Sequence, residues 1–204
     1  MQWPQGRATG WIEYAKGLRN SMALAVHPLS GELWQAENSR DAISARNATL
    51  NDQTLPHDEL NLIHANGHYG WPYCYDNNSA SPEYANWNCV GYTPPVKLLP
   101  SHAAPLGMAF LSGHTWPRAL HGALLIAFHG YRTNGHRLMA YPFDAAGHPQ
   151  GKPVELIGGW EATHTTPMGA PVDIKVGADG AAFLSEDRNG TVLRLVYDKT
   201  SPTR

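Results

Sequence analysis

The sequence predicts an all-β protein built of β-propeller blades, each a sheet of four antiparallel strands, with about three blades in residues 1–204. Three observations support this fold class. Apolar residues alternate with polar ones in short runs, turn residues separate the runs, and one strand–turn–strand pattern occurs three times. With 20 glycines, 16 prolines and only 16% charged residues, the composition favours a turn-rich β protein. We expect a single partial propeller domain.

The repeated unit has an alternating apolar strand, a turn closed by glycine, and a second strand that ends in a polar residue. Its three copies are residues 22–38, 105–130 and 171–190. A third strand is expected after each copy, at 58–67, 136–144 and 191–198. Outer fourth strands are expected at 94–100 and 153–159. Four antiparallel strands per repeat are typical of a propeller blade. An ordinary β-sandwich is the alternative, but it does not explain the repetition.

The units are longer than compact propeller blades, and their excess lies in polar stretches at 38–57, 74–95 and 161–169. Such loops often build the site of a propeller. The last unit lacks an outer strand, and residues 10–18 are expected to be an unpaired strand suited to that position. Three blades cannot close a ring without exposing apolar faces. We therefore expect either a piece of a larger propeller or a homodimer that completes six blades.

Charge and cysteine content limit the binding partners and the cellular compartment that the sequence predicts. The net charge of -2 gives no basis for binding nucleic acid or an anionic membrane. No apolar run is long enough to span a bilayer, and residues 1–10 do not resemble a signal peptide, so export would need a leader not seen here. Cys74 and Cys89 are expected to form a disulfide that orders the polar loop between them, in a periplasmic or extracellular setting. Two free thiols in a cytosolic protein are the alternative.

Two motifs carry a family resemblance: GLRN at residues 17–20, and DELNLI followed by NGHYGWP within residues 58–72. Together with segments 101–113 and 189–197, they make the chain resemble the soluble quinoprotein sugar dehydrogenases of the glucose and sorbosone dehydrogenase family. This resemblance implies a six-bladed propeller that carries pyrroloquinoline quinone (PQQ) and calcium. The implied reaction oxidises a small sugar, an aldose or a sorbosone-like sugar, by hydride transfer to the quinone. The chain corresponds to about the C-terminal half of such an enzyme.

The resemblance assigns several side chains to the cofactor. Arg19 and Asn20 match a pair over the quinone, where a guanidinium and an amide would stabilise charge on the reduced cofactor. Without the motif, they would be a loop cap and a turn residue. His102 matches a polar contact to the quinone, and His129 ends an inner strand that should face the same axis. No histidine pair has the spacing of a zinc site.

The resemblance also assigns metal ligands. The backbone carbonyls of Ser39 and Arg40 match those that bind the cofactor's calcium, and oxygen ligands suit this hard cation. That stretch lacks the family's usual glycine and carries an insert at 41–56. Glu59 and Tyr69 match a second calcium site of some members. Outside that role, Glu59 would be a solvated strand-end carboxylate, and its neighbour Asp58 is expected at the surface.

Two departures from the family pattern weigh against full activity of this chain alone. The family's catalytic histidine, which takes the proton from the sugar C1 hydroxyl, lies on a blade absent here, so the catalytic residue is unknown. The RPV motif reads APV at Ala170 and Pro171, which removes a contact to a cofactor carboxylate worth about 1.5–3 kcal/mol.

Two other functions stay open. The first is a non-catalytic half-propeller that binds carbohydrate or serves assembly. The second is an unrelated calcium lactonase propeller, which the motifs at 17–20 and 66–72 disfavour.

Overall fold

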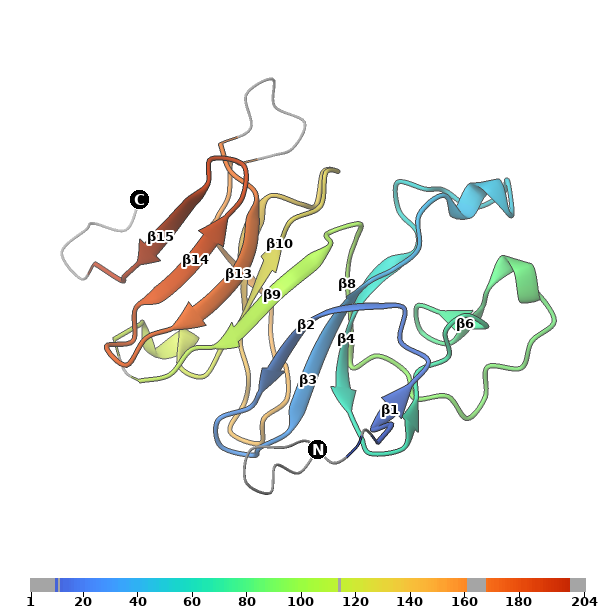
Figure 1. The fold of residues 1–204 in the computed structure, drawn as a ribbon, viewed down its shortest axis with the longest axis horizontal. Coiled ribbons are helices and arrows are strands. Elements are labelled where there is room, and N and C mark those ends of the chain that lie inside the picture. The colour runs from blue at the N-terminus through green and yellow to red at the C-terminus, as the bar shows by residue number, and fades with distance from the viewer. Residues whose placement is uncertain (1–9, 11, 114, 161–167, 199–204) are drawn as a thin grey trace.

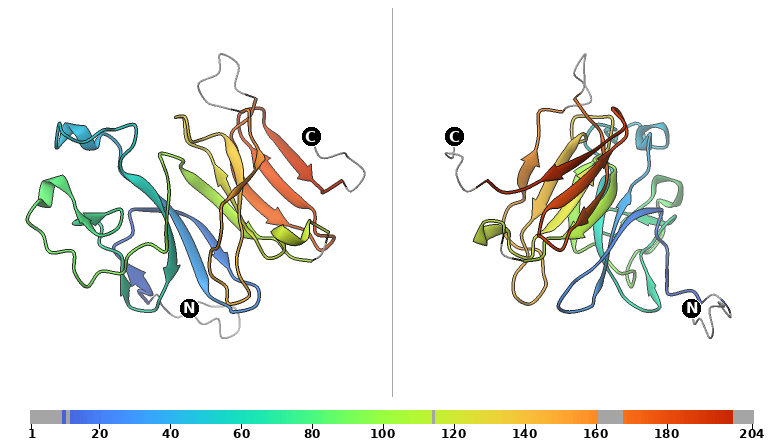
Figure 2. Two further views of the ribbon diagram at one scale, coloured as in Figure 1. Left: turned by 180° about the vertical axis from the view of Figure 1, so that it is seen from behind. Right: turned by 60° about the vertical axis from the view of Figure 1, so that its left-hand side comes forward.

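The computed structural model describes residues 10, 12–113, 115–160 and 168–198. Its main strands form three antiparallel sheets that fan out side by side (Figures 1 and 2). Short 3₁₀ turns provide the helical structure of the described residues, at Ile43–Ala45, Pro82–Tyr84 and Arg118–Leu120. No helix in the described part of the chain is both long and apolar enough to cross a membrane. Residues 161–167 of the expected polar stretch at 161–169 lie outside the described residues.

The first sheet has the strand order β2-β3-β4-β8. Its strands are β2 (Asn20–Val26), β3 (Leu33–Asn38), β4 (His57–Ile63) and β8 (Lys97–Ser101). Each strand pairs antiparallel with the next, which is the order of a propeller blade. The alternation in the sequence and the expected outer strand at 94–100 are therefore confirmed for this blade.

The second sheet repeats this order, and the third repeats three strands of it. The second sheet contains β9 (Pro105–Phe110), β10 (Leu124–Phe128), β11 (Arg137–Tyr141) and β12 (Val154–Ile157). The third contains β13 (Pro171–Val176), β14 (Ala182–Glu186) and β15 (Thr191–Leu195). Among the described residues, no fourth strand pairs with β15. The last unit thus lacks its outer strand, as the sequence predicts.

The N-terminal strand does not take the position expected from the sequence. Instead of serving as an outer blade strand, β1 (Ala15–Lys16) pairs in parallel with β5 (Gly67–His68). The N–H of Tyr69 donates to the Lys16 carbonyl at 2.9 Å, which extends this pairing. The expectation that this segment is a free strand for the last blade is therefore wrong, because Ala15 and Lys16 pair with the loop after β4.

A disulfide closes the long loop between β4 and β8. It joins Cys74 to Cys89, 15 positions further along the chain. A small hairpin of β6 (Cys74–Tyr75) and β7 (Ser79–Ala80) begins the enclosed segment. A cross-link over a loop of this length restricts the unfolded chain by roughly 3 kcal/mol in the loop-entropy model. This restriction offsets the scarcity of apolar residues in the loop.

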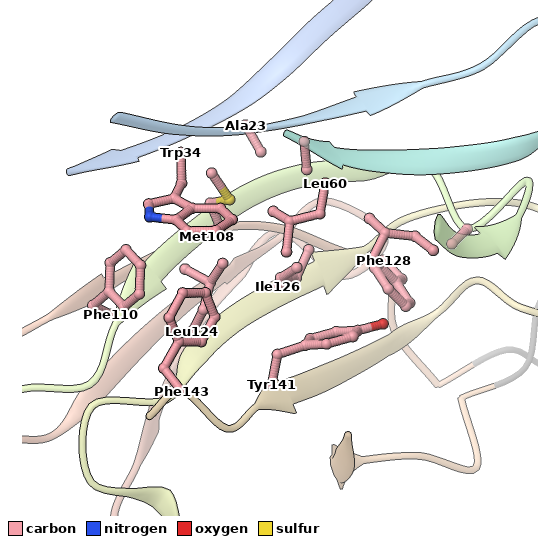
Figure 3. Close-up of a cluster of buried hydrophobic side chains, with 13 residues drawn as sticks. Ala23, Trp34, Leu60, Met108, Phe110, Leu124, Ile126, Phe128, Tyr141 and Phe143 are labelled. Atoms are coloured by element: carbon pink, nitrogen blue, oxygen red, sulfur yellow. The ribbon is translucent and has the colours of Figure 1, made fainter. Parts of the chain in front are cut away.

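Strand β10 lies at the centre of the molecule and is buried along its whole length. Because successive strand residues point to opposite faces, its side chains supply two apolar clusters. Leu124, Ile126 and Phe128 join the cluster shared with the first sheet, which Figure 3 shows around Trp34 and Leu60. The residues between them, Leu125 and Ala127, join the cluster shared with the third sheet. The middle sheet therefore packs on both of its faces.

Gly107 on β9 permits close approach of the inner strands. A Cβ atom at this position would lie 2.5 Å from the Cα atom of Asp173 on β13, closer than real Cβ contacts. Any side chain at this position would force the two backbones apart. Gly107 therefore helps to fix the spacing of the second and third sheets.

The free strand of the first sheet exposes a row of apolar side chains, and the free strand of the third exposes valines on either side of the charged Arg194. Met22, Leu24 and Val26 lie on one face of β2, and each side chain is more than half exposed. Val192 on β15 and Val196 just beyond it are likewise more than half exposed. Rows of exposed apolar side chains on regular strands are typical of surfaces that pack against another element.

Substitution of a residue in the first cluster should lower stability sharply. Leu60 on β4 is fully buried among the aromatic and aliphatic side chains of Figure 3. We expect Leu60→Ala to lower the free energy of unfolding by about 2–5 kcal/mol, measured by urea denaturation. The control is Leu29→Ala, in a side chain that is 87% exposed, and it should change stability by less than about 0.5 kcal/mol. Equal effects of the two substitutions would contradict the assigned core.

Candidate functional site

A polar pocket of about 260 Å³ opens where β2 begins, β3 ends and the loops before β9 and after β10 meet. It brings together residues from five separate stretches of the chain. The lining residues are Arg19, Asn20, Asn38, Ser39, Asp41, Asp58, His102, Ala104, Gly130, Tyr131 and Arg132. Four of them, Arg19, Asn20, Ser39 and His102, are residues to which the sequence assigns a site role.

Arg19 is fixed to the end of β3 by three hydrogen bonds. Its Nη1 donates to the carbonyls of Asn38 at 3.0 Å and Ser39 at 2.7 Å. Its backbone N–H donates to Glu37 Oε2 at 3.0 Å. The guanidinium also lies over the ring of Trp71, 5.6 Å from the ring centroid. These contacts hold a cation in a defined orientation at the mouth of the pocket.

Asp58 is a structural centre of the pocket and does not lie at the surface as the sequence suggested. Its side chain is 1% exposed. One carboxylate oxygen accepts the Ser39 N–H at 2.7 Å, and the other accepts the Ala104 N–H at 2.6 Å. Burial raises the pKa of Asp58 to about 6, while these two donors oppose the shift. The carboxylate thereby joins the end of β3 to the loop before β9.

His102 lies in that loop with a defined tautomer. Its Nε2 is 3.1 Å from the Leu55 carbonyl, which can only accept, so Nε2 carries the proton in the neutral ring. Nδ1 is then the acceptor, 3.7 Å from Asp41. The backbone of His102 is left-handed, with φ of 55°, and this conformation costs a residue with a side chain on the order of 1 kcal/mol or more. The His102 carbonyl lies so close to Gly130 that a Cβ there would clash.

Two buried carboxyl groups lie behind Arg19. Glu37 and Glu59 are directly opposite on β3 and β4, and both side chains are buried. Burial raises the pKa of Glu37 to about 7, although the hydrogen bond from the Arg19 N–H acts to lower this pKa. Burial and then the charge of Glu37 raise the pKa of Glu59 to about 9. Glu59 is therefore not a solvated strand-end carboxylate, and at neutral pH it is protonated.

Several residues assigned from the sequence lie outside the pocket. Tyr69 donates its hydroxyl to the Leu62 carbonyl at 2.6 Å and accepts the His64 N–H, so its side chain is engaged within its own loop. The ring of His129 lies 3.0 Å from Asp187, between the second and third sheets. Arg40 lies in an adjoining pocket, where its guanidinium binds both oxygens of Glu83. The second calcium site at Glu59 and Tyr69 stays a prediction, and in this structure the Tyr69 hydroxyl is bonded to backbone groups of Leu62 and His64.

Among the lining residues to which the sequence assigned no site role are Asn38, Asp41 and Arg132. Arg132 donates to the Asp52 carbonyl, and its guanidinium lies 4.0 Å from Asp41. Asn38 Oδ1 is buried and has no hydrogen-bond partner among the described residues. The sequence gives a signal for only one of these three residues: Asn38 is the last residue of the strand that precedes Ser39. Asp41 and Arg132 come together through loop geometry that periodicity does not encode.

The described residues contain no cluster of three or more histidine, cysteine, aspartate or glutamate side chains placed to hold a metal. A cation at this pocket would therefore depend on carbonyl and amide oxygens. The Ser39 carbonyl and the unpartnered Asn38 Oδ1 are two oxygens of that kind among the residues of the pocket wall. Neutral oxygen donors of this type are typical of calcium sites.

The Glu37–Glu59 pair predicts an unusual pH dependence of stability. A raised pKa in the folded state means that folding favours the protonated carboxyl group. In calcium-free buffer we therefore expect the contribution of this pair to the free energy of unfolding to be highest below about pH 4.5. It should fall as the pH rises toward 9. Glu59→Gln should flatten this decline in thermal melts, while Glu13→Gln, in an exposed side chain, should not. A profile unchanged by Glu59→Gln would refute the assignment.

Comparisons with known proteins agree with the fold and the motifs. A family model described as Glucose / Sorbosone dehydrogenase matches residues 12–194. An uncharacterised protein of Borreliella burgdorferi is 27% identical over 192 residues, which cover 91% of this chain and 48% of that protein. A pyrroloquinoline quinone-dependent sugar dehydrogenase of Hypocrea jecorina is 24% identical over 227 residues, which cover 93% and 48%. This chain thus spans about half the length of these relatives.

The fold is also similar to solved structures. The iodide and calcium structures of a Trichoderma reesei member of Carbohydrate-Active Enzymes Family AA12 give TM-scores of 0.74 and 0.72 at 22% identity. Each comparison covers 87% of this chain and 52% of that chain. At this identity the likeness concerns the fold, and the family match carries the assignment. The chain belongs to the glucose/sorbosone dehydrogenase family.

Proposed function

We propose that this chain supplies one half of a PQQ- and calcium-dependent site at which a propeller of this family oxidises an aldose or a sorbosone-like sugar. One observation carries the proposal. Arg19, Asn20 and His102, which match the family's cofactor contacts, line a single pocket although they come from distant segments. The PQQ dependence of the Hypocrea jecorina relative supports the same cofactor.

The pocket fits an anionic planar quinone. When bound, PQQ accepts a hydride equivalent from the sugar. Arg19 presents a guanidinium anchored to backbone carbonyls, and Arg132 presents a second one on the opposite segment. Ala170, where the family has an arginine, is buried and donates its N–H to Glu186. We assign to Arg132 the carboxylate contact that Ala170 cannot make.

Calcium fits the oxygens beside Arg19. The Ser39 carbonyl accepts one hydrogen bond from Arg19 and retains a second lone pair. Asn38 Oδ1 adds a buried acceptor without a partner among the described residues. A calcium ion bound there would satisfy both groups and would add positive charge where the cofactor's carboxylates are expected.

His102 is the residue of this chain best placed to hold a proton near the cofactor. Its Nε2–H is held by the Leu55 carbonyl, which leaves Nδ1 as the basic nitrogen beside Asp41. We propose that His102 can accept a proton in this half of the site. The disulfide favours a periplasmic or extracellular setting.

The alternative function is a non-catalytic half-propeller that binds carbohydrate, and cofactor binding separates the two. We expect PQQ with calcium to quench the tryptophan fluorescence of this chain saturably. Arg19→Ala should weaken PQQ binding by about tenfold or more, because it removes a charge-assisted contact. Arg194→Ala is the control, since Arg194 pairs with Asp179 far from the pocket. Absence of saturable quenching up to millimolar PQQ would favour the alternative.

The exposed apolar side chains on β2 and at β15 support a proposal about assembly. We propose that they pack against each other between two copies, so that two chains complete one six-bladed ring. This arrangement needs no exchange of β1, which pairs with β5 of its own chain. Sedimentation of the purified chain should show a dimer, and Leu24→Glu should yield monomers. A parent chain that sediments as a monomer at high concentration would contradict the dimer.

A further inference from the structure

A second pocket adjoins the first on the side of the disulfide loop. It has a volume of about 370 Å³ and shares Arg19 and Asp41 with the first pocket. Its other walls include Trp71 and Tyr84. The two pockets therefore form a continuous trough that runs from the candidate cofactor site toward the loop closed by Cys74 and Cys89.

Aromatic rings line this trough and extend it. Trp71 packs against the guanidinium of Arg19 at the inner end. Further out, the Tyr84 ring lies 4.9 Å from that of Tyr73, and Tyr73 stacks on Trp87 with ring centroids 4.1 Å apart. Tyr84 and Trp87 are 40% and 44% exposed, so each offers a free ring face. Flat aromatic surfaces that remain exposed in a folded loop are typical of ligand contacts.

Trp87 itself lines a third, open hollow of about 490 Å³. Asn86 and Asn88 line it beside Trp87 and Tyr92. Trp87 Nε1 donates to the Tyr92 hydroxyl at 3.0 Å, which fixes the indole ring. Side-chain amides next to a fixed aromatic ring provide both donors and acceptors for hydroxyl groups.

The charges at the outer end of the trough are compensated. Arg40 binds both oxygens of Glu83 at 2.5 and 2.6 Å, and Arg46 lies 3.2 Å from the same carboxylate. Beyond Arg19 and Asp41 at the inner end, a ligand in this pocket therefore meets no isolated charge that would demand a counter-ion. An uncharged ligand with apolar faces and many hydroxyl groups matches such a surface, and this description fits a chain of pyranose rings.

We propose that this trough binds the sugar units that follow the one held at the first pocket, so that the protein recognises oligosaccharides in preference to monosaccharides. The inference rests on the proposed function for the position of the terminal sugar. The aromatic faces of Trp71, Tyr84 and Trp87 supply the contacts for the following units. The disulfide holds the segment that carries Tyr84 and Trp87 in place before the ligand arrives.

The test measures binding in the absence of PQQ, by titration calorimetry with glucose and with the malto- and cello-oligosaccharides of two to five units. We expect the affinity to rise at least about tenfold from glucose to the trisaccharide of one series, which corresponds to about 1.4 kcal/mol. Tyr84→Ala and, independently, Trp87→Ala should remove most of this gain and leave glucose binding unchanged. Tyr197→Ala, in another exposed tyrosine outside the trough, is the matched control and should keep the gain.

The outcomes separate the inference from the proposed function. Equal affinities for glucose and for the trisaccharides of both series would overturn the inference, as would failure to bind any of these sugars. So would a loss in Tyr84→Ala and Trp87→Ala that is as large for glucose as for the trisaccharide. PQQ titration of the same samples reports on the cofactor site alone. Thermal melts of each variant confirm that a loss of binding does not reflect unfolding.

Discussion

The candidate site depends on the burial of one carboxylate, that of Asp58. It accepts one N–H from the residue after β3 and another from the loop before β9, so it connects two blades at the rim of the pocket. A buried carboxylate is costly unless donors surround it, and these two backbone donors offset that cost. Because both donors belong to segments without regular structure, Asp58 substitutes for the sheet hydrogen bonds that those segments lack. The positions of Ser39 and His102 follow from this arrangement.

Much of the fold was predictable, because strand alternation and turn residues are local. The strand–turn–strand units, the outer strands near 94–100 and 153–159 and the missing outer strand of the last unit all follow from periodicity. Strand β10 shows the limit of the same reasoning. Its continuous apolar run, LLIAF, indicates burial on both faces but does not say which neighbours provide it.

The site was less predictable, because side chains reach backbone groups far along the chain. From the local sequence, Asp58 looks like a surface residue beside Glu59. Its two hydrogen-bond donors lie 19 and 46 positions away, so the local sequence does not reveal them. Residues 10–18 look like a blade strand, but a two-residue parallel pairing with Gly67 and His68 holds them instead. His129 follows an inner strand as expected, but its ring is hydrogen-bonded to Asp187 and does not line the pocket. Motif matching placed Arg19, Asn20 and His102, while Arg132 and Asp41 needed the three-dimensional arrangement of the loops.

The burial of β10 on both faces also determines how the stabilities of the three sheets are coupled. One strand supplies alternate side chains to both apolar clusters, so neither outer sheet has a core of its own. Each outer sheet is stabilised by its contact with the middle sheet, as neighbouring units are in a linear repeat array. Local opening of the first sheet would therefore expose the middle sheet on one side and weaken its support of the third. The cooperativity of unfolding in this chain thus depends on a single five-residue strand, β10. The backbone amide hydrogens of β10 should be among the slowest to exchange with solvent.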